Sequence, residues 1–168
     1  MTVDTVVRLS SGEAQHLTAA LFAAHGVPEA EAAIAAGCLV RADLRGVDTH
    51  GIVRLPIYLR RLDMGLVTAT PDLTVQRVAR AAAHLDGQSG LGFVVATRAM
   101  DAAMEMAAEA GVGLVGVSNS NHFGMAASYL LQAVERGFAA LVFTNASPAL
   151  PPWGGRREML GTSPFAAA

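Results

Sequence analysis

Downstream of Pro71 the chain alternates short strand-like runs with long helical patterns, and this alternation restricts the fold more than any other feature. Runs of strand length lie at 73–78, 82–85, 112–117 and 139–144. Helical patterns at 93–110 and 123–136 separate the later runs. The first two runs predict an antiparallel pair, and the last two, with the helix between them, predict a parallel β-α-β unit. We therefore expect an α/β protein in which helices cover a mixed sheet.

Upstream of Pro71 the patterns are purely helical. A first helix is expected from Ser11 to His25, and a second from Pro28 to about Leu44, packed together as a hairpin. A third is expected over 52–63, with Pro56 either starting or kinking it. Its apolar residues recur at helical spacing and predict a buried stripe: Ile52, Leu55, Leu59 and Leu62.

Composition excludes several classes of function. With 52% hydrophobic and 15% charged residues the chain can bury a substantial core. Its apolar runs are shorter than the roughly 20 residues of a membrane span, and Met1–Ser10 lacks the pattern of a secretory signal. We therefore expect a cytoplasmic protein with no membrane partner. A net charge of −2 without a basic stripe argues against nucleic acid as a partner.

The sequence contains no lysine, so only arginine or protonated histidine can hold an anionic ligand through a side-chain cation. Schiff-base and lysine general-base chemistry are excluded for the same reason, unless another chain contributes a lysine. The single cysteine, Cys38, lies in an apolar helical pattern and is interpreted as a core thiol.

Gly111–Gly116 matches the G-x-G-x-x-G dinucleotide pattern, but the order of elements around it is reversed. In a Rossmann fold a strand precedes these glycines and a helix follows, whereas here a helix precedes them and they lie within a strand. We expect instead that the missing side chains allow a helix to pack closely on the sheet.

The segment after 112–117 has a better geometry for binding an anion. A polar loop, 118–121, leads into a helix that is expected to open at His122, where free backbone N–H groups would face a phosphate or carboxylate. The alternative is an ordinary helix, capped by Ser120 or Asn121, with nothing bound.

A second polar cluster follows Asp43. If the backbone is helical from His50 onward, one stripe carries a proton donor, guanidinium groups and a phenol: His50, Arg54, Tyr58 and Arg61. An arginine can grip a carboxylate with two hydrogen bonds while a histidine exchanges a proton. The alternatives are a solvated helix face, or a weak metal site made by Asp43, Asp48 and His50.

The pattern Leu-Arg-Gly-x-Asp-Thr-His-Gly-x-x-Arg-Leu-Pro-x-Tyr at 44–58 resembles the signature of the type 2 malate/L-lactate dehydrogenase family. Segments 119–126, 144–155 and 161–164 resemble later parts of that family in the same order. Family members are longer, so the chain resembles their N-terminal half and we expect it to be truncated at Ala168.

The resemblance implies a non-Rossmann α/β fold and a homodimer. It implies NAD- or NADP-dependent interconversion of a 2-hydroxy acid, such as malate or lactate, with its 2-oxo acid, or reduction of a cyclic imine carboxylate. Residues 1–70 would form an N-terminal helical segment that carries the His/Arg motif, and 71–168 the first part of a cofactor-binding α/β domain. The alternative is a truncated, inactive remnant or interaction module of that fold.

The resemblance also implies individual roles. Thr49 and His50 match a Ser-His pair that relays a proton with an aspartate beyond Ala168, and Thr49 keeps the hydroxyl but adds a methyl group. Arg54 matches the arginine that binds the substrate carboxylate, while Tyr58 and Thr162 match further substrate contacts. His122 matches a residue that serves as acid/base in some members, so His50 and His122 both remain candidates. The predicted cofactor contacts are His122, Phe123, Gly124, Met125, Ala126, Asn145 and Ser147.

Overall fold

The computed structural model describes residues 7–168. The first six residues of the predicted 1–70 segment lie outside the described residues, as does most of the Met1–Ser10 stretch in which no secretory signal is expected. The helical hairpin is confirmed as α1 (Ser11–Ala24) and α2 (Glu29–Leu44). Helix α1 begins with a capping box, in which the Ser10 side chain and Glu13 bond to each other's backbone N–H groups.

The third helix follows the alternative in which Pro56 starts it and does not kink it. It is α3 (Leu55–Asp63), preceded by two single 3₁₀ turns, η1 (Asp48–His50) and η2 (Ile52–Arg54). Pro56 explains the boundary, because proline lacks a backbone N–H and is tolerated in the first turn of a helix but not inside it. The Asp43 carboxylate accepts a hydrogen bond from the Ile52 N–H at 2.9 Å and ties the second turn to α2.

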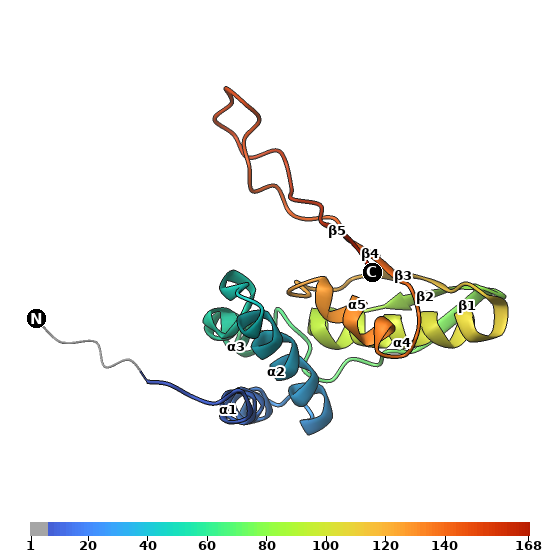
Figure 1. The fold of residues 1–168 in the computed structure, drawn as a ribbon. Helices are drawn as coiled ribbons and strands as arrows, with labels where there is room; N and C mark the ends of the chain where they lie inside the picture. Colours follow the sequence, from blue (N-terminus) through green and yellow to red (C-terminus); the bar gives the residue numbers. More distant parts are fainter. Residues whose placement is uncertain (1–6) are drawn as a thin grey trace, which may run out of the picture.

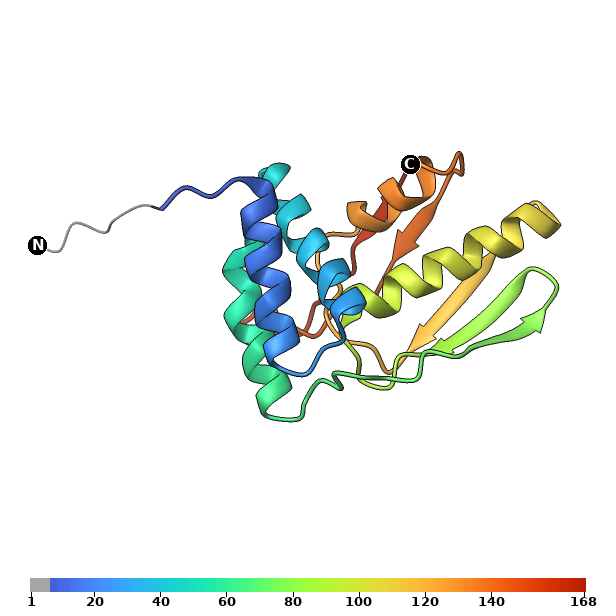
Figure 2. The ribbon, with the colours of Figure 1, turned by 90° about the horizontal axis from the view of Figure 1, so that it is seen from below.

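The mixed sheet is confirmed. β1 (Val75–Ala79) pairs antiparallel with β2 (Ala82–Asp86), and β2 pairs parallel with β3 (Leu114–Ser118). Helix α4 (Gly92–Ala110) connects β2 to β3 and lies along one face of this sheet (Figure 2). The parallel β-α-β unit is therefore β2-α4-β3.

Of the glycine-rich run, Gly113 alone has the expected role, since Gly111 ends α4 and nothing lies near Gly116. A Cβ atom on Gly113 would lie 1.9 Å from the carbonyl oxygen of Ala103 in α4. Only a residue without a side chain lets the helix approach the start of β3 this closely.

The predicted parallel pairing of 112–117 with 139–144 is wrong. After α5 (Ala127–Val134), strand β4 (Leu141–Phe143) pairs antiparallel with β5 (Phe165–Ala167) in a separate two-stranded sheet. Strand patterns indicate that a strand exists but not which edge it joins, and here a segment at the end of the chain takes the edge of β4. Residues 144–164 between β4 and β5 form an arm that leaves the body of the molecule (Figure 1).

The main core joins the three N-terminal helices to α4 and α5. Phe22, Leu39, Phe93 and Tyr129 are buried in it, and the predicted apolar stripe of α3 packs against it. Cys38 is buried there as expected, and burial raises the pKa of its thiol. The helices in the described part of the chain include none with the length and apolar character needed to cross a membrane.

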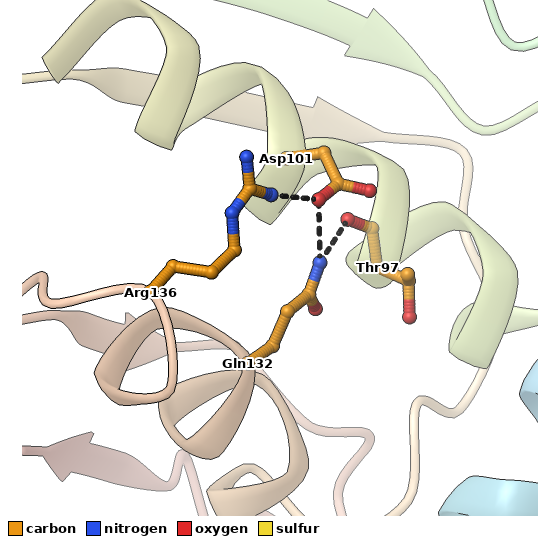
Figure 3. Close-up of polar contacts among 4 residues, drawn as sticks. All are labelled: Thr97, Asp101, Gln132 and Arg136. Carbon is orange, nitrogen blue, oxygen red and sulfur yellow. Dashed lines mark hydrogen bonds and ion pairs between the residues drawn. The ribbon is translucent and has the colours of Figure 1, made fainter. Parts of the chain in front are cut away.

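Polar contacts fix α5 on α4 at the edge of this core (Figure 3). The Asp101 carboxylate accepts hydrogen bonds from Arg136 at 2.8 Å and from Gln132 at 2.9 Å, and Gln132 also donates to the carbonyl oxygen of Thr97. These contacts hold the C-terminal part of α5 on α4.

Candidate active site

The loop after β3 is anchored by side chains rather than by a helix. The Asp86 carboxylate accepts hydrogen bonds from the backbone of Gln88 and the side chain of Asn119, which lower its pKa. The Asn121 amide donates to the carbonyl oxygens of Ser89 and Gly90 at 2.8 and 3.1 Å. This loop therefore delivers the next residue, His122, to a defined position.

The predicted helix start at His122 is wrong, as is the predicted capping by Ser120 or Asn121. Helix α5 begins at Ala127, five residues later. Gly124 explains the delay, because its backbone φ of +73° is left-handed and interrupts a right-handed helix. Within the described residues, the backbone N–H groups of Met125, Ala126 and Ala127 have no acceptor, so donors for an anion are still present at the true start of α5.

Two parts of the chain meet through His122. The Tyr58 hydroxyl lies 2.7 Å from His122 Nδ1, across 64 positions of sequence. The ring of His50 stacks on that of His122 with centroids 5.5 Å apart. Tyr58 is buried, with its ring edge against Phe93. The structure thus brings together three predicted site residues: His50, Tyr58 and His122.

Thr49 and Arg54 complete this group. The Thr49 hydroxyl lies 2.9 Å from His50 Nδ1, in the arrangement expected of a hydroxyl–imidazole pair. The Arg54 Nε atom donates to the Thr49 carbonyl oxygen at 2.6 Å. This bond uses one of the five N–H donors of Arg54, and residues 7–168 provide no acceptor for the others, so they are available to a ligand.

Arg61 was part of the predicted polar stripe, but its partner was not foreseen. Its Nη2 atom donates to Asn121 Oδ1 at 2.9 Å. Because the Asn121 amide also bonds to the backbone before α4, this one side chain connects α3, α4 and the His122 segment. The sequence signal for this contact is the polar character of Asn121, which fits a helix cap equally well.

The electrostatics favour the neutral form of both imidazoles. His122 is exposed when the whole residue is considered, but its ring is partly desolvated. This desolvation lowers the pKa of His122 to about 4, and the charges of Arg54 and His50 lower it further. Desolvation and Arg54 also lower the pKa of His50. Burial raises the pKa of Tyr58 to about 12, so its hydroxyl keeps its proton at neutral pH.

Three of the predicted contacts lie elsewhere. Asn145, Ser147 and Thr162 are exposed on the arm, and within the described residues no hydrogen bond connects them to the histidine cluster (Figure 1). Two hollows of about 930 and 520 Å³ lie beside α2 and α4, and neither is lined by His50 or His122. The cluster itself, with three segments converging on two imidazoles and a guanidinium, is the better candidate for chemistry.

Asp43, Asp48 and His50 do not form a metal site in this arrangement. The Asp43 carboxylate is bonded to the Ile52 N–H, and residues 7–168 contain no group of three His, Cys, Asp or Glu side chains arranged to hold a metal ion.

The fold and the cluster define an α/β protein whose polar site is built where an N-terminal helical segment meets the loop after a parallel strand. The chain belongs to the malate/L-lactate dehydrogenase family, whose family model matches residues 9–168. This finding confirms the resemblance in the motifs.

Individual relatives agree with the family. The chain is 42% identical to the L-sulfolactate dehydrogenase of Methanocaldococcus jannaschii over 143 residues, which are 85% of this chain and 42% of that protein. It is 37% identical to the (2R)-3-sulfolactate dehydrogenase (NADP(+)) of Chromohalobacter salexigens over 160 residues, which are 95% of this chain and 48% of that protein.

The solved structure of malate dehydrogenase from Pyrococcus horikoshii OT3 is similar with a TM-score of 0.91 and 39% identity, covering 96% of this chain and 46% of that one. The fold prediction is thereby confirmed. The chain spans less than half the length of these relatives.

Proposed function

We propose that this chain is part of a nicotinamide-dependent oxidoreductase that interconverts a small 2-hydroxy acid and its 2-oxo acid, acting as a homodimer in the cytoplasm. The observation that carries the proposal is the contact of His50 and Tyr58 with His122, beside the available guanidinium of Arg54. The names of the relatives, which include malate and sulfolactate dehydrogenases, support the same substrate class.

Arg54 is the proposed carboxylate clamp. Its Nε is already held by the Thr49 carbonyl oxygen, which orients the guanidinium next to His50. Planar guanidinium donors match the two oxygens of a carboxylate, so a substrate bound there would present its C2 oxygen to the imidazoles. Tyr58 is proposed to line the substrate site beside Arg54. Thr162 is also proposed as a substrate contact, and because it lies on the arm, the arm would have to approach the site.

Reduction of the 2-oxo group requires a hydride at carbon and a proton at oxygen. The nicotinamide, when bound, supplies the hydride with its two electrons and is left oxidised. In oxidation a neutral imidazole accepts the proton of the C2 hydroxyl, and in reduction the same ring, protonated from solvent, returns a proton to the C2 oxygen. His50 and His122 are the side chains placed for this exchange, with Thr49 bonded to the first.

The segment His122–Ala126 is proposed to hold the cofactor together with the start of α5. The free N–H groups of Met125, Ala126 and Ala127 suit its negatively charged phosphates. Asn145 and Ser147 are proposed as further contacts. Either NAD or NADP is the cofactor, and the named dependence of one relative on NADP(+) supports the nicotinamide class.

The clamp is tested with Arg54→Ala. Loss of the carboxylate partner should lower kcat/KM for 2-oxo acids by on the order of 2–5 kcal/mol in transition-state free energy. Arg60→Ala, which removes an exposed arginine from the helix that follows Arg54, is the matched control and should leave kcat/KM unchanged. NADH or NADPH oxidation is followed by absorbance, and equal kinetics in the two variants would contradict the assignment.

A second candidate is an inactive remnant or interaction module. The observation that favours it is the exposed apolar surface of the arm and of β4 and β5, which includes Trp153, Met159 and Phe165. If the purified chain binds neither NADH nor NADPH, shows no turnover with 2-oxo acids and self-associates in light scattering, this candidate replaces the dehydrogenase. Turnover with one of the cofactors excludes it.

A further inference from the structure

Two groups that can donate a hydrogen bond lie next to His122 Nδ1. The Gly124 backbone N–H donates to it at 3.3 Å, and the Tyr58 hydroxyl lies 2.7 Å away. A backbone N–H can only donate, so its hydrogen occupies the side of the ring where an Nδ1–H would have to point. Nδ1 therefore acts as the acceptor, and the Tyr58 O–H donates to it as well, so that one nitrogen accepts from two donors.

This assignment leaves one place for the ring proton. A neutral imidazole carries one N–H, and with Nδ1 accepting, the proton sits on Nε2. Within the described residues His122 Nε2 has no hydrogen-bond partner, so it is the donor that the ring offers to a ligand. A second proton would have to enter at Nδ1, where it would displace the Gly124 N–H and turn the Tyr58 hydroxyl from donor to acceptor, beside the positive charge of Arg54 and against the stacked ring of His50.

His50 is held differently. Its Nδ1 faces the Thr49 hydroxyl at 2.9 Å, and a hydroxyl can either donate or accept. His50 can therefore change its protonation at either nitrogen without losing this partner, which is the property that proton exchange requires. The two stacked imidazoles are thus unequal.

We propose that Tyr58 is a positioning residue that, with the Gly124 amide, fixes His122 as the neutral Nε2–H tautomer, so that His122 donates a hydrogen bond to the substrate's C2 oxygen and His50 alone exchanges the proton. The substrate part rests on the proposed function, whereas the tautomer does not. Tyr58 acts through His122 and needs no contact with substrate.

The tautomer is measured directly by long-range ¹H–¹⁵N correlation of histidine rings in the ¹⁵N-labelled chain, with His122 assigned through His122→Gln. At neutral pH Nδ1 of His122 should show the shift of an unprotonated nitrogen and Nε2 that of a protonated one. A protonated Nδ1 overturns the proposal, and because no cofactor or substrate is present, this result is independent of whether the protein is a dehydrogenase.

Tyr58→Phe removes the stronger donor and keeps the ring. The Nδ1–H form should then become populated, and the midpoint of the His122 titration should rise by about one pH unit, which corresponds to the loss of one hydrogen bond. Tyr129→Phe is the matched control, because Tyr129 donates its hydroxyl proton to the carbonyl oxygen of Phe123, next to His122, without touching the ring. An unchanged spectrum in Tyr58→Phe, or the same change in both variants, overturns the role of Tyr58.

Kinetics separate the two histidines. Asparagine retains an N–H donor but cannot exchange a proton at neutral pH, so His122→Asn should keep a measurable share of kcat for 2-oxo acid reduction. His50→Asn should lose at least about 100-fold, the lower end of the contribution of a general acid. Equal losses in the two variants overturn the division of roles while leaving the proposed function intact.

Discussion

At the scale of single residues, the site depends on side chains that each make more than one contact. Asn121 bonds to the backbone before α4 and to Arg61 on α3, and Tyr58 packs on Phe93 while its hydroxyl reaches His122. Each of these residues is at once part of the packing and part of the site. Substitutions here are expected to change both stability and function.

The lowered pKa of His122 predicts a pH dependence of stability. Its pKa is about 4 in the folded chain and about 6.5 when unfolded. Between these values the unfolded state binds the extra proton, so acidification from pH 7 toward pH 4 should lower the free energy of unfolding. His50 acts in the same direction.

The measurement is the denaturant midpoint of unfolding at pH 7 and pH 5, for the wild type and for His122→Gln. The variant cannot titrate at this position, so its midpoint should fall less between the two pH values. Asp86 and Glu13, whose pKa values are also lowered, contribute equally to both proteins and cancel in the comparison. An equal fall of the midpoint in both proteins would show that folding does not lower the pKa of His122.

At the scale of elements, the site is positioned by how closely α4 lies on the sheet and how α5 is fixed to α4. Gly113 permits the close contact of α4 with the sheet. The hydrogen bonds of Asp101 with Arg136 and Gln132 fix α5 on α4 (Figure 3). The parallel pair β2–β3 then places the loop after β3 beside the start of α4.

Gly113→Ala tests the contact between α4 and the sheet. The added methyl would overlap the Ala103 carbonyl oxygen, so α4 must shift, which should lower the free energy of unfolding by about 1–3 kcal/mol. Gly116→Ala is the matched control, because nothing lies within 4 Å of its added Cβ. Equal stability of the two variants in urea unfolding would mean that the close approach is not required.

At the scale of the whole molecule, the described chain divides into a packed body and an arm. The body contains the core shared by α1–α5, whereas the arm 144–164 exposes apolar side chains and carries three of the predicted site residues (Figure 1). The division of the chain at residue 70 remains a prediction, and the main core draws residues from both sides of it.

Trp153 is the only tryptophan and lies fully exposed at the arm. In dilute solution its fluorescence should therefore resemble that of the unfolded chain in emission maximum and in quenching by acrylamide. If the arm contacts a second copy, the emission should shift to the blue as the concentration rises, in step with the mass from light scattering. A blue-shifted emission from a monomer would contradict the exposed position of the arm.

The amino-acid sequence by itself determined the helices, the strands β1–β3 and the family, because helical and strand periodicity, helix-ending glycines and the 44–58 motif are local. The sequence also predicted His50, Arg54, Tyr58 and Arg61 on one stripe of a helix that is continuous from His50, but that helix is interrupted: His50 and Arg54 lie in two 3₁₀ turns separated by the extended Gly51. Only the tertiary structure decided the pairing of β4 with β5, the delayed start of α5 at Ala127, and the contact of Tyr58 with His122. These three features depend on which segments distant in sequence pack together. Long-range contacts compete with one another, and a local sequence pattern does not encode the outcome.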